Sequence, residues 1–146
     1  TLIDSVGRKV AFLDEVIATL SLENVTTLVT RSEDLARGEA RESFDLVTAR
    51  AVAPLDALAE LGAPLLKTGG SLVAWKGEPE PEGEAAVLRT SDRTGMTVDR
   101  SVPVRPYSSS RERRLYILKK IAPTSDNLPR RPGLARKRPL AGRRSN

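Results

Sequence analysis

Strand-like and helix-like segments alternate along the first half of the chain, and this alternation constrains the fold more than any other feature. Short apolar runs typical of buried strands lie at 1–5, 25–29, 44–48 and 71–75. Helical spacing or helix-ending residues mark the stretches at 6–20, 31–38 and 54–61. A chain that alternates in this way is predicted to form an α/β domain in which helices cover a parallel sheet.

The last two strand candidates, 97–104 and 114–121, are connected differently. About ten residues without a helical pattern separate them, which is too short for the crossover that parallel neighbours require. We therefore expect this pair to be antiparallel. The predicted sheet is mostly parallel and ends in an antiparallel hairpin.

Arg50 follows one of the predicted strands at a position where parallel sheets bind ligands. Phe44, Leu46 and Val47 form the apolar run, and Arg50 lies just past its carboxyl end. In open α/β sheets the carboxyl ends of the strands border the crevice that holds ligands. Arg50 is therefore a candidate binding or catalytic residue, and a solvated loop arginine is the alternative.

Asp4 is the second candidate, because it lies at the end of the apolar run at 1–5. An acid at the end of a strand in such a sheet can accept hydrogen bonds from a ribose diol. The same residue could instead cap the helix at 6–20. The spacing does not decide between these two roles.

Composition removes whole classes of chemistry. The 146 residues contain no cysteine and no histidine. They therefore cannot form thiol nucleophiles, serine–histidine triads, disulfides or zinc sites with cysteine or histidine ligands. They also lack a side chain that normally shuttles protons near neutral pH. No apolar run of about 18 residues and no signal-peptide pattern is present, so we expect a cytoplasmic protein.

Basic residues are concentrated at the C-terminus. Between Ile121 and Asn146 there are seven lysines and arginines and one acid, so this segment has a charge of +6, whereas the whole chain has +5. The segment is rich in proline and lacks apolar periodicity, which predicts an extended basic arm at 122–146 attached to a domain at 1–121. Such an arm favours a polyanionic partner, and a disordered solubilising tail is the alternative.

Several motifs, most of them at predicted strand ends, resemble one family. The most specific are Thr48-Ala49-Arg50-Ala51-Val52-Ala53, Trp75-Lys76-Gly77 and Pro129-Arg130-Arg131-Pro132-Gly133. Further matches are Leu2-Ile3-Asp4-Ser5, Arg31-Ser32-Glu33-Asp34, Leu65-Leu66-Lys67-Thr68-Gly69-Gly70 and Lys137-Arg138-Pro139-Leu140. Together they resemble the RsmG family, formerly called glucose-inhibited division protein B, over residues 1 to about 141.

The resemblance implies a fold and a function. Members of the family are Rossmann-like, S-adenosylmethionine-dependent enzymes that methylate N7 of a guanine in small-subunit (16S) ribosomal RNA. By this resemblance, Asp4 and Ser5 would face the ribose of the cofactor, and Ser32 and Glu33 its adenine. Arg50 would be the catalytic residue, facing the cofactor or the RNA. In such a protein the basic arm would bind RNA through Arg130, Arg131, Lys137 and Arg138.

One family feature is missing from the sequence. The family begins with a helical region, a first strand and a Gly-x-Gly-x-Gly-Phe-Pro-Gly type of loop that holds the methionine part of the cofactor, and the 146 residues contain none of these. We therefore expect a sheet without its first strand and a chain that is inactive by itself. Two alternatives stay open, a nicotinamide-dependent Rossmann oxidoreductase and a non-catalytic fragment that binds RNA. We expect a monomer that binds small-subunit ribosomal RNA or its 30S-type precursor, with no membrane and no metal.

Overall fold

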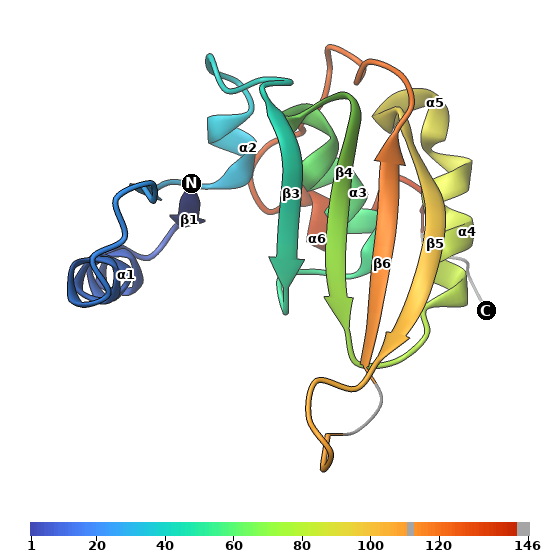
Figure 1. The fold of residues 1–146 in the computed structure, drawn as a ribbon. Helices are drawn as coiled ribbons and strands as arrows, with labels where there is room; N and C mark the ends of the chain where they lie inside the picture. Colours follow the sequence, from blue (N-terminus) through green and yellow to red (C-terminus); the bar gives the residue numbers. More distant parts are fainter. Residues whose placement is uncertain (111–112, 143–146) are drawn as a thin grey trace.

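The computed structural model describes residues 1–110 and 113–142, and its strands fall into two groups (Figure 1). β1 (Leu2–Asp4) and β2 (Thr27–Val29) form a parallel pair, and α1 (Gly7–Thr19) connects them. The other four strands form the main sheet in the order β3-β4-β6-β5. Among the described residues no strand joins the two groups, so the sheet is interrupted between β1 and β3.

The first half of the main sheet is parallel. β3 (Phe44–Arg50) pairs with β4 (Leu66–Lys76), and α3 (Leu55–Gly62) and the short helix η1 (Ala63–Leu65) connect them. The motif at 65–70 therefore lies almost entirely within β4. Gly70 is required there, because a Cβ atom at this position would lie 2.9 Å from the carbonyl oxygens of Asp45 and Lys67.

The second half of the main sheet is antiparallel. α4 (Pro81–Arg89) and α5 (Ser91–Thr94) lead from β4 to β5 (Met96–Val104), which pairs with β6 (Arg113–Lys120). β6 also runs antiparallel to β4. This arrangement confirms the predicted α/β sheet with a terminal antiparallel hairpin.

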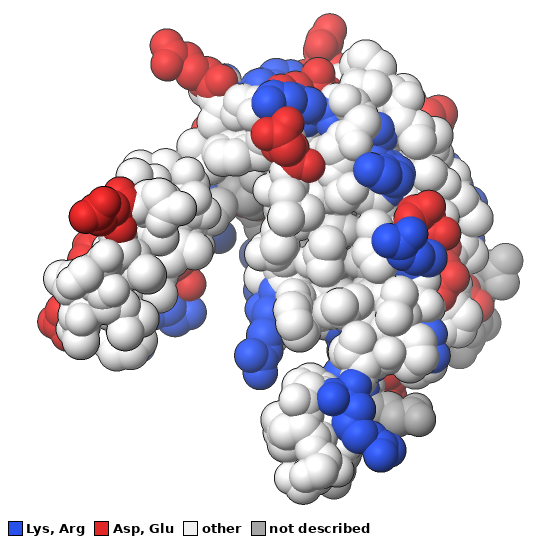
Figure 2. All heavy atoms as spheres, viewed as in Figure 1, with Lys and Arg blue, Asp and Glu red and all other residues white. Residues whose placement is uncertain are grey.

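The core lies on one face of the main sheet, beneath α3 and α4 (Figure 1). Leu72, Tyr116 and Leu118 are buried on this face, and every residue of α3 except Asp56 is buried. The opposite face carries exposed apolar side chains at Leu46, Trp75 and Val102, and it is largely uncharged (Figure 2). A doubly wound sheet has helices on both faces, whereas this sheet has one covered and one open face.

The β1–β2 pair is more exposed than the sequence predicts. The run at 1–5 reads as a buried strand, but Leu2 is 40% exposed and Val29 is 60% exposed. α1 buries only Val10. The physical reason is the interruption of the sheet, because a strand with one neighbour and one covering helix cannot bury both of its faces.

The C-terminal segment is packed against the domain, which corrects the prediction of an extended arm. We call residues 122–142 the strap; Arg143 and Arg144 of the predicted arm lie outside the described residues. Leu128 and Ala135 of the strap are buried. The Arg41 guanidinium donates hydrogen bonds to the carbonyls of Thr124, Ser125 and Leu128. These bonds satisfy carbonyl groups that no strand or helix would pair.

Candidate functional site

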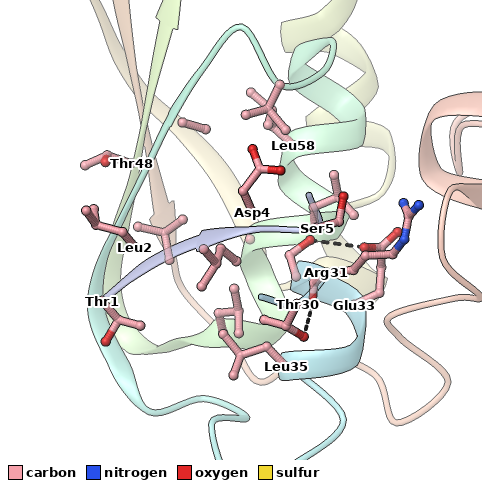
Figure 3. A pocket seen from close by; sticks show the side chains of 18 of the residues that line it. Thr1, Leu2, Asp4, Ser5, Thr30, Arg31, Glu33, Leu35, Thr48 and Leu58 are labelled. Atoms are coloured by element: carbon pink, nitrogen blue, oxygen red, sulfur yellow. Dashed lines mark hydrogen bonds between the residues drawn. The ribbon is translucent and has the colours of Figure 1, made fainter. Parts of the chain in front are cut away.

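One cavity of about 850 Å³ lies between the β1–β2 pair and the main sheet (Figures 2 and 3). Its walls are formed by β1 and β3 along nearly their whole length, the start of α2 (Ser32–Leu35), part of α3 and the strap. Small-molecule sites typically measure about 300–1,000 Å³. All the residues predicted to bind cofactor line this cavity: Asp4, Ser5, Ser32, Glu33 and Arg50.

Asp4 projects from the end of β1 into the cavity (Figure 3). One carboxylate oxygen accepts a hydrogen bond from the Val6 amide at 2.8 Å, and the other accepts one from the Lys9 ammonium at 3.2 Å. The Val6 amide and then Lys9 hold the pKa of Asp4 below its usual value. The bond to Val6 orders the turn into α1, so Asp4 stabilises the helix entry and still lines the cavity. A carboxylate has about four acceptor sites, which leaves capacity for ligand hydroxyls.

Glu33 is less accessible than a ligand-binding carboxylate would be. Its side chain accepts hydrogen bonds from the Gly133 amide at 2.8 Å and the Ser32 hydroxyl at 3.2 Å, and Glu33 is 6% exposed. α2 begins at Ser32, and Arg31 occupies its N-cap position. Glu33 therefore joins the strap to the cavity wall.

β3 extends two residues beyond the predicted strand at 44–48, so Arg50 is its last residue rather than a residue past its end, and it is exposed. Within the part of the chain that the structure describes, its side chain forms no ion pair. Ala51 follows with φ of +56°, a conformation that costs roughly 1–2 kcal/mol for a residue other than glycine. Backbone strain of this kind is concentrated at functional sites, where the surrounding structure maintains it.

The Trp75-Lys76-Gly77 motif holds the loop that follows Arg50. The Lys76 ammonium donates to the Ala53 carbonyl at 2.7 Å and pairs with the Glu80 carboxylate at 2.7 Å. Glu80 in turn accepts a hydrogen bond from the backbone amide of the first residue of α3 at 2.9 Å. These bonds fix the connection between β3 and α3 against the end of β4. Lys76 is thus a positioning residue for the strained loop.

The predicted RNA-binding residues of the tail fall into two groups. Arg131, Lys137 and Arg138 are exposed. Arg130 instead forms two hydrogen bonds with the Glu60 carboxylate of α3, at 2.8 and 2.6 Å, and these bonds raise the pKa of Arg130. Glu60 is 1% exposed, and a buried carboxylate requires such a partner. Arg130 is therefore engaged by Glu60 and is not the RNA-binding residue that the sequence predicts.

Two further arginines line the cavity. Arg31 precedes α2, and Arg136 lies on α6 (Leu134–Lys137); both are exposed. The position of Arg31 just after a predicted strand was a usable signal for it. Arg136 carried no such signal, because it belongs to a segment without apolar periodicity.

The sequence of this chain is similar to those of known proteins. The family described as rRNA small subunit methyltransferase G (GidB) matches residues 1–113. Ribosomal RNA small subunit methyltransferase G of Limosilactobacillus reuteri is 37% identical over 146 residues, which cover 96% of this chain and 59% of the relative. The protein of the same name from Carboxydothermus hydrogenoformans is 38% identical over 140 residues, covering 95% of this chain and 60% of the relative. The chain thus spans about three fifths of the length of these relatives.

Solved structures share the fold. TYW2 of M. jannaschii in complex with AdoMet has a TM-score of 0.58 at 15% identity, covering 82% of this chain and 57% of that chain. NSun6 of Pyrococcus horikoshii with SFG has a TM-score of 0.61 at 15% identity, covering 82% of this chain and 41% of that chain. These similarities show a Rossmann-like methyltransferase fold. The match over residues 1–113, with identities of 37–38% along almost the whole chain, shows that the chain belongs to the rRNA small subunit methyltransferase G (GidB) family.

Proposed function

We propose that the chain forms the larger part of an S-adenosylmethionine-dependent methyltransferase that acts on small-subunit ribosomal RNA, with N7 of a guanine as the acceptor. The observation that carries this proposal is the arrangement of Asp4, Ser5, Ser32, Glu33 and Arg50 around one cavity. The curated relatives are named as small-subunit ribosomal RNA methyltransferases, which supports the RNA substrate.

The cavity fits a nucleoside cofactor. Asp4 is held in its charged form and retains acceptor sites for a ribose diol, with Ser5 beside it. Because the Glu33 carboxylate is hydrogen-bonded to the strap, Ser32 is the residue that offers a polar contact to the adenine. Leu58 of α3 provides an apolar part of the cavity wall. S-adenosylmethionine bound there would supply an electrophilic methyl group.

Methylation at guanine N7 requires little from the protein beyond positioning. N7 carries a free lone pair, so no proton leaves before the transition state and no general base is needed. The absence of histidine from the 146 residues is compatible with this reaction. Holding the two reactants in the correct geometry is worth about 7–11 kcal/mol in well-oriented systems. Arg50, exposed at the cavity, can donate to the O6 edge of guanine.

The two alternatives are weakened to different degrees. A nicotinamide-dependent oxidoreductase is disfavoured by the family match and has no need of the antiparallel end of the sheet. The second alternative, a fragment that binds RNA without catalysis, concerns the 146 residues by themselves. They span about three fifths of the length of the relatives.

The direct test uses the product of the complete gene. It is incubated with S-adenosylmethionine carrying a labelled methyl group and with small-subunit ribosomal RNA from a strain that lacks this modification. Mass spectrometry of nuclease fragments is expected to place the label on N7 of one guanine. Label on another base, or no label in the RNA, would contradict the proposal.

Replacing Arg50 with alanine is expected to lower methyl transfer about ten- to a hundredfold, because one charge-assisted hydrogen bond is worth roughly 1.5–3 kcal/mol. Single-turnover rates and RNA affinity are measured in the product of the complete gene. Arg89→Ala is the control, since Arg89 is also exposed but ends α4 and does not line the cavity. Unchanged rates and RNA affinity in Arg50→Ala would identify Arg50 as a solvated arginine with no role in the reaction.

The 146-residue chain by itself is expected to bind the cofactor weakly or not at all. β1 and β3 both border the cavity, and no described strand lies between them to complete its wall. Calorimetric titration with S-adenosylhomocysteine is therefore expected to give little heat at concentrations that saturate the complete gene product. A micromolar dissociation constant for the isolated chain would show that the interruption does not matter for binding.

A further inference from the structure

The cavity holds more positive charge than its own acids neutralise. Two acids line it, and both are already engaged: Asp4 pairs with Lys9 at 3.2 Å, and Glu33 accepts a hydrogen bond from the Gly133 amide. Arg31, Arg50 and Arg136 also line the cavity. Among residues 1–110 and 113–142 none of these three arginines forms an ion pair.

The strap brings one of these arginines to the cavity from a distant part of the sequence. Arg136 follows Ala135, which is 2% exposed and packs with Ala57 and Leu61 of α3. On the preceding side of Arg136, the Gly133 amide is bound to Glu33 at 2.8 Å. The backbone that carries Arg136 is therefore fixed on both the cavity wall and α3.

The position of Arg136 suits an anionic partner that approaches from solvent. The Arg136 residue is exposed although it lines the cavity, so it belongs to the rim. A guanidinium presents planar, paired donors that match the oxygens of a phosphate group. Lys137 and Arg138 follow it on the surface, and they extend the positive charge away from the cavity.

We propose that Arg136 is a phosphate-binding residue that holds the backbone of the RNA at the rim of the cavity while the cofactor occupies the interior. This inference rests on the proposed function, and it deepens that function by assigning part of the RNA site to the strap. The strap thereby positions the substrate next to the cofactor site.

The test measures RNA binding by Arg136→Ala in the product of the complete gene, at several salt concentrations and with a fragment of small-subunit ribosomal RNA. Loss of one phosphate contact is expected to lower the slope of log K against log salt by about 0.7, which corresponds to about fivefold weaker binding at about 0.1 M salt. Arg136→Lys keeps the charge and is expected to retain the slope. Arg89→Ala, which removes an exposed arginine away from the cavity, is expected to change neither quantity.

A second titration separates the phosphate of the RNA from the carboxylate of the cofactor. S-adenosylhomocysteine is expected to bind Arg136→Ala as tightly as the unaltered protein. If Arg136→Ala binds S-adenosylhomocysteine more weakly but binds RNA normally, Arg136 is not a phosphate-binding residue. The same conclusion follows if the variant binds both the compound and the RNA normally. An unaltered protein that binds the RNA but transfers no methyl group would instead refute the proposed function and leave the role of Arg136 in RNA binding standing.

Discussion

Lys120→Ala is expected to lower the free energy of unfolding by about 3 kcal/mol, the lower end of the usual cost of removing one partner from a buried ion pair, because the Glu42 side chain is 29% exposed. The Lys120 side chain is 0% exposed, and its ammonium pairs with Glu42 at 2.9 Å. It also donates to the Ala63 carbonyl at 2.6 Å and the Thr124 hydroxyl at 2.5 Å. Burial lowers the pKa of Lys120, and Glu42 opposes this shift. The substitution would remove the cation that pairs with Glu42 and one hydrogen-bond donor each from the Ala63 carbonyl and the Thr124 hydroxyl.

The effect is measured by urea unfolding monitored by circular dichroism. Lys119→Ala is the matched control, because its ammonium makes one hydrogen bond, to the Gly69 carbonyl at 3.1 Å, in an exposed setting. A typical hydrogen bond contributes about 0.5–1.5 kcal/mol, so the control is expected to lose no more than about 1.5 kcal/mol. Equal losses in both variants would contradict the role of Lys120 as the link between β6, η1 and the strap.

Arg130→Ala is expected to cost about 3 kcal/mol and to release the strap from α3. The lower end of the range for buried pairs applies, because the Arg130 side chain keeps 21% exposure while the side chain of Glu60 keeps 2%. The unpaired Glu60 carboxylate would then be buried without a cation. Thermal unfolding gives the stability, and limited digestion with trypsin reports whether residues of the strap become accessible.

Two further variants make this second experiment decisive. Arg131→Ala removes the neighbouring exposed arginine and is expected to change stability by less than about 0.5 kcal/mol. The double variant Arg130→Ala with Glu60→Gln removes the unpaired charge and is expected to recover part of the loss. A double variant as unstable as Arg130→Ala alone would show that lost packing, rather than the buried charge, dominates.

The strand ends of the site were predictable from the sequence for a simple geometric reason. Parallel strands present their carboxyl ends at one edge of a sheet, so residues that follow separate apolar runs meet there. Asp4 and Arg50 are 46 positions apart and line the same cavity. The order of the runs and their connections was enough to predict this, without knowledge of any side-chain contact.

The strap was not predictable in the same way, because its contacts join distant residues. Arg130 reads as one cation in a basic tail, while its partner Glu60 lies 70 residues earlier. A signal was present on the other side of the pair: α3 is apolar on nearly all sides, as Leu55, Leu58, Ala59 and Leu61 indicate. An acid in a helix that is buried all round needs a cation, although the sequence does not say which one.

Lys120 shows a second limit of local patterns. Two lysines at the end of a strand suggest a solvated edge, and β6 ends in Lys119 and Lys120. Successive side chains of a strand point to opposite faces, so one of the two had to face the covered side of the sheet. The oxygens that accept hydrogen bonds from the Lys120 ammonium belong to η1 and the strap. The pattern within β6 carries no information about either segment.

The interruption between β1 and β3 divides the chain into parts of unequal stability. Val10 is the one buried residue among the first 30 residues, whereas the main sheet and its helices hold nearly all of the core. Segments with few buried apolar contacts open at a lower free energy than the core does. Asp4 therefore lies in the part expected to open at the lower free energy, and Arg50 lies on the strand of the main sheet that borders the interruption. Cofactor binding would therefore have to order the Asp4 side of the cavity, which lowers the net free energy of binding. The affinity for the cofactor would rise when that side of the cavity is already held in place.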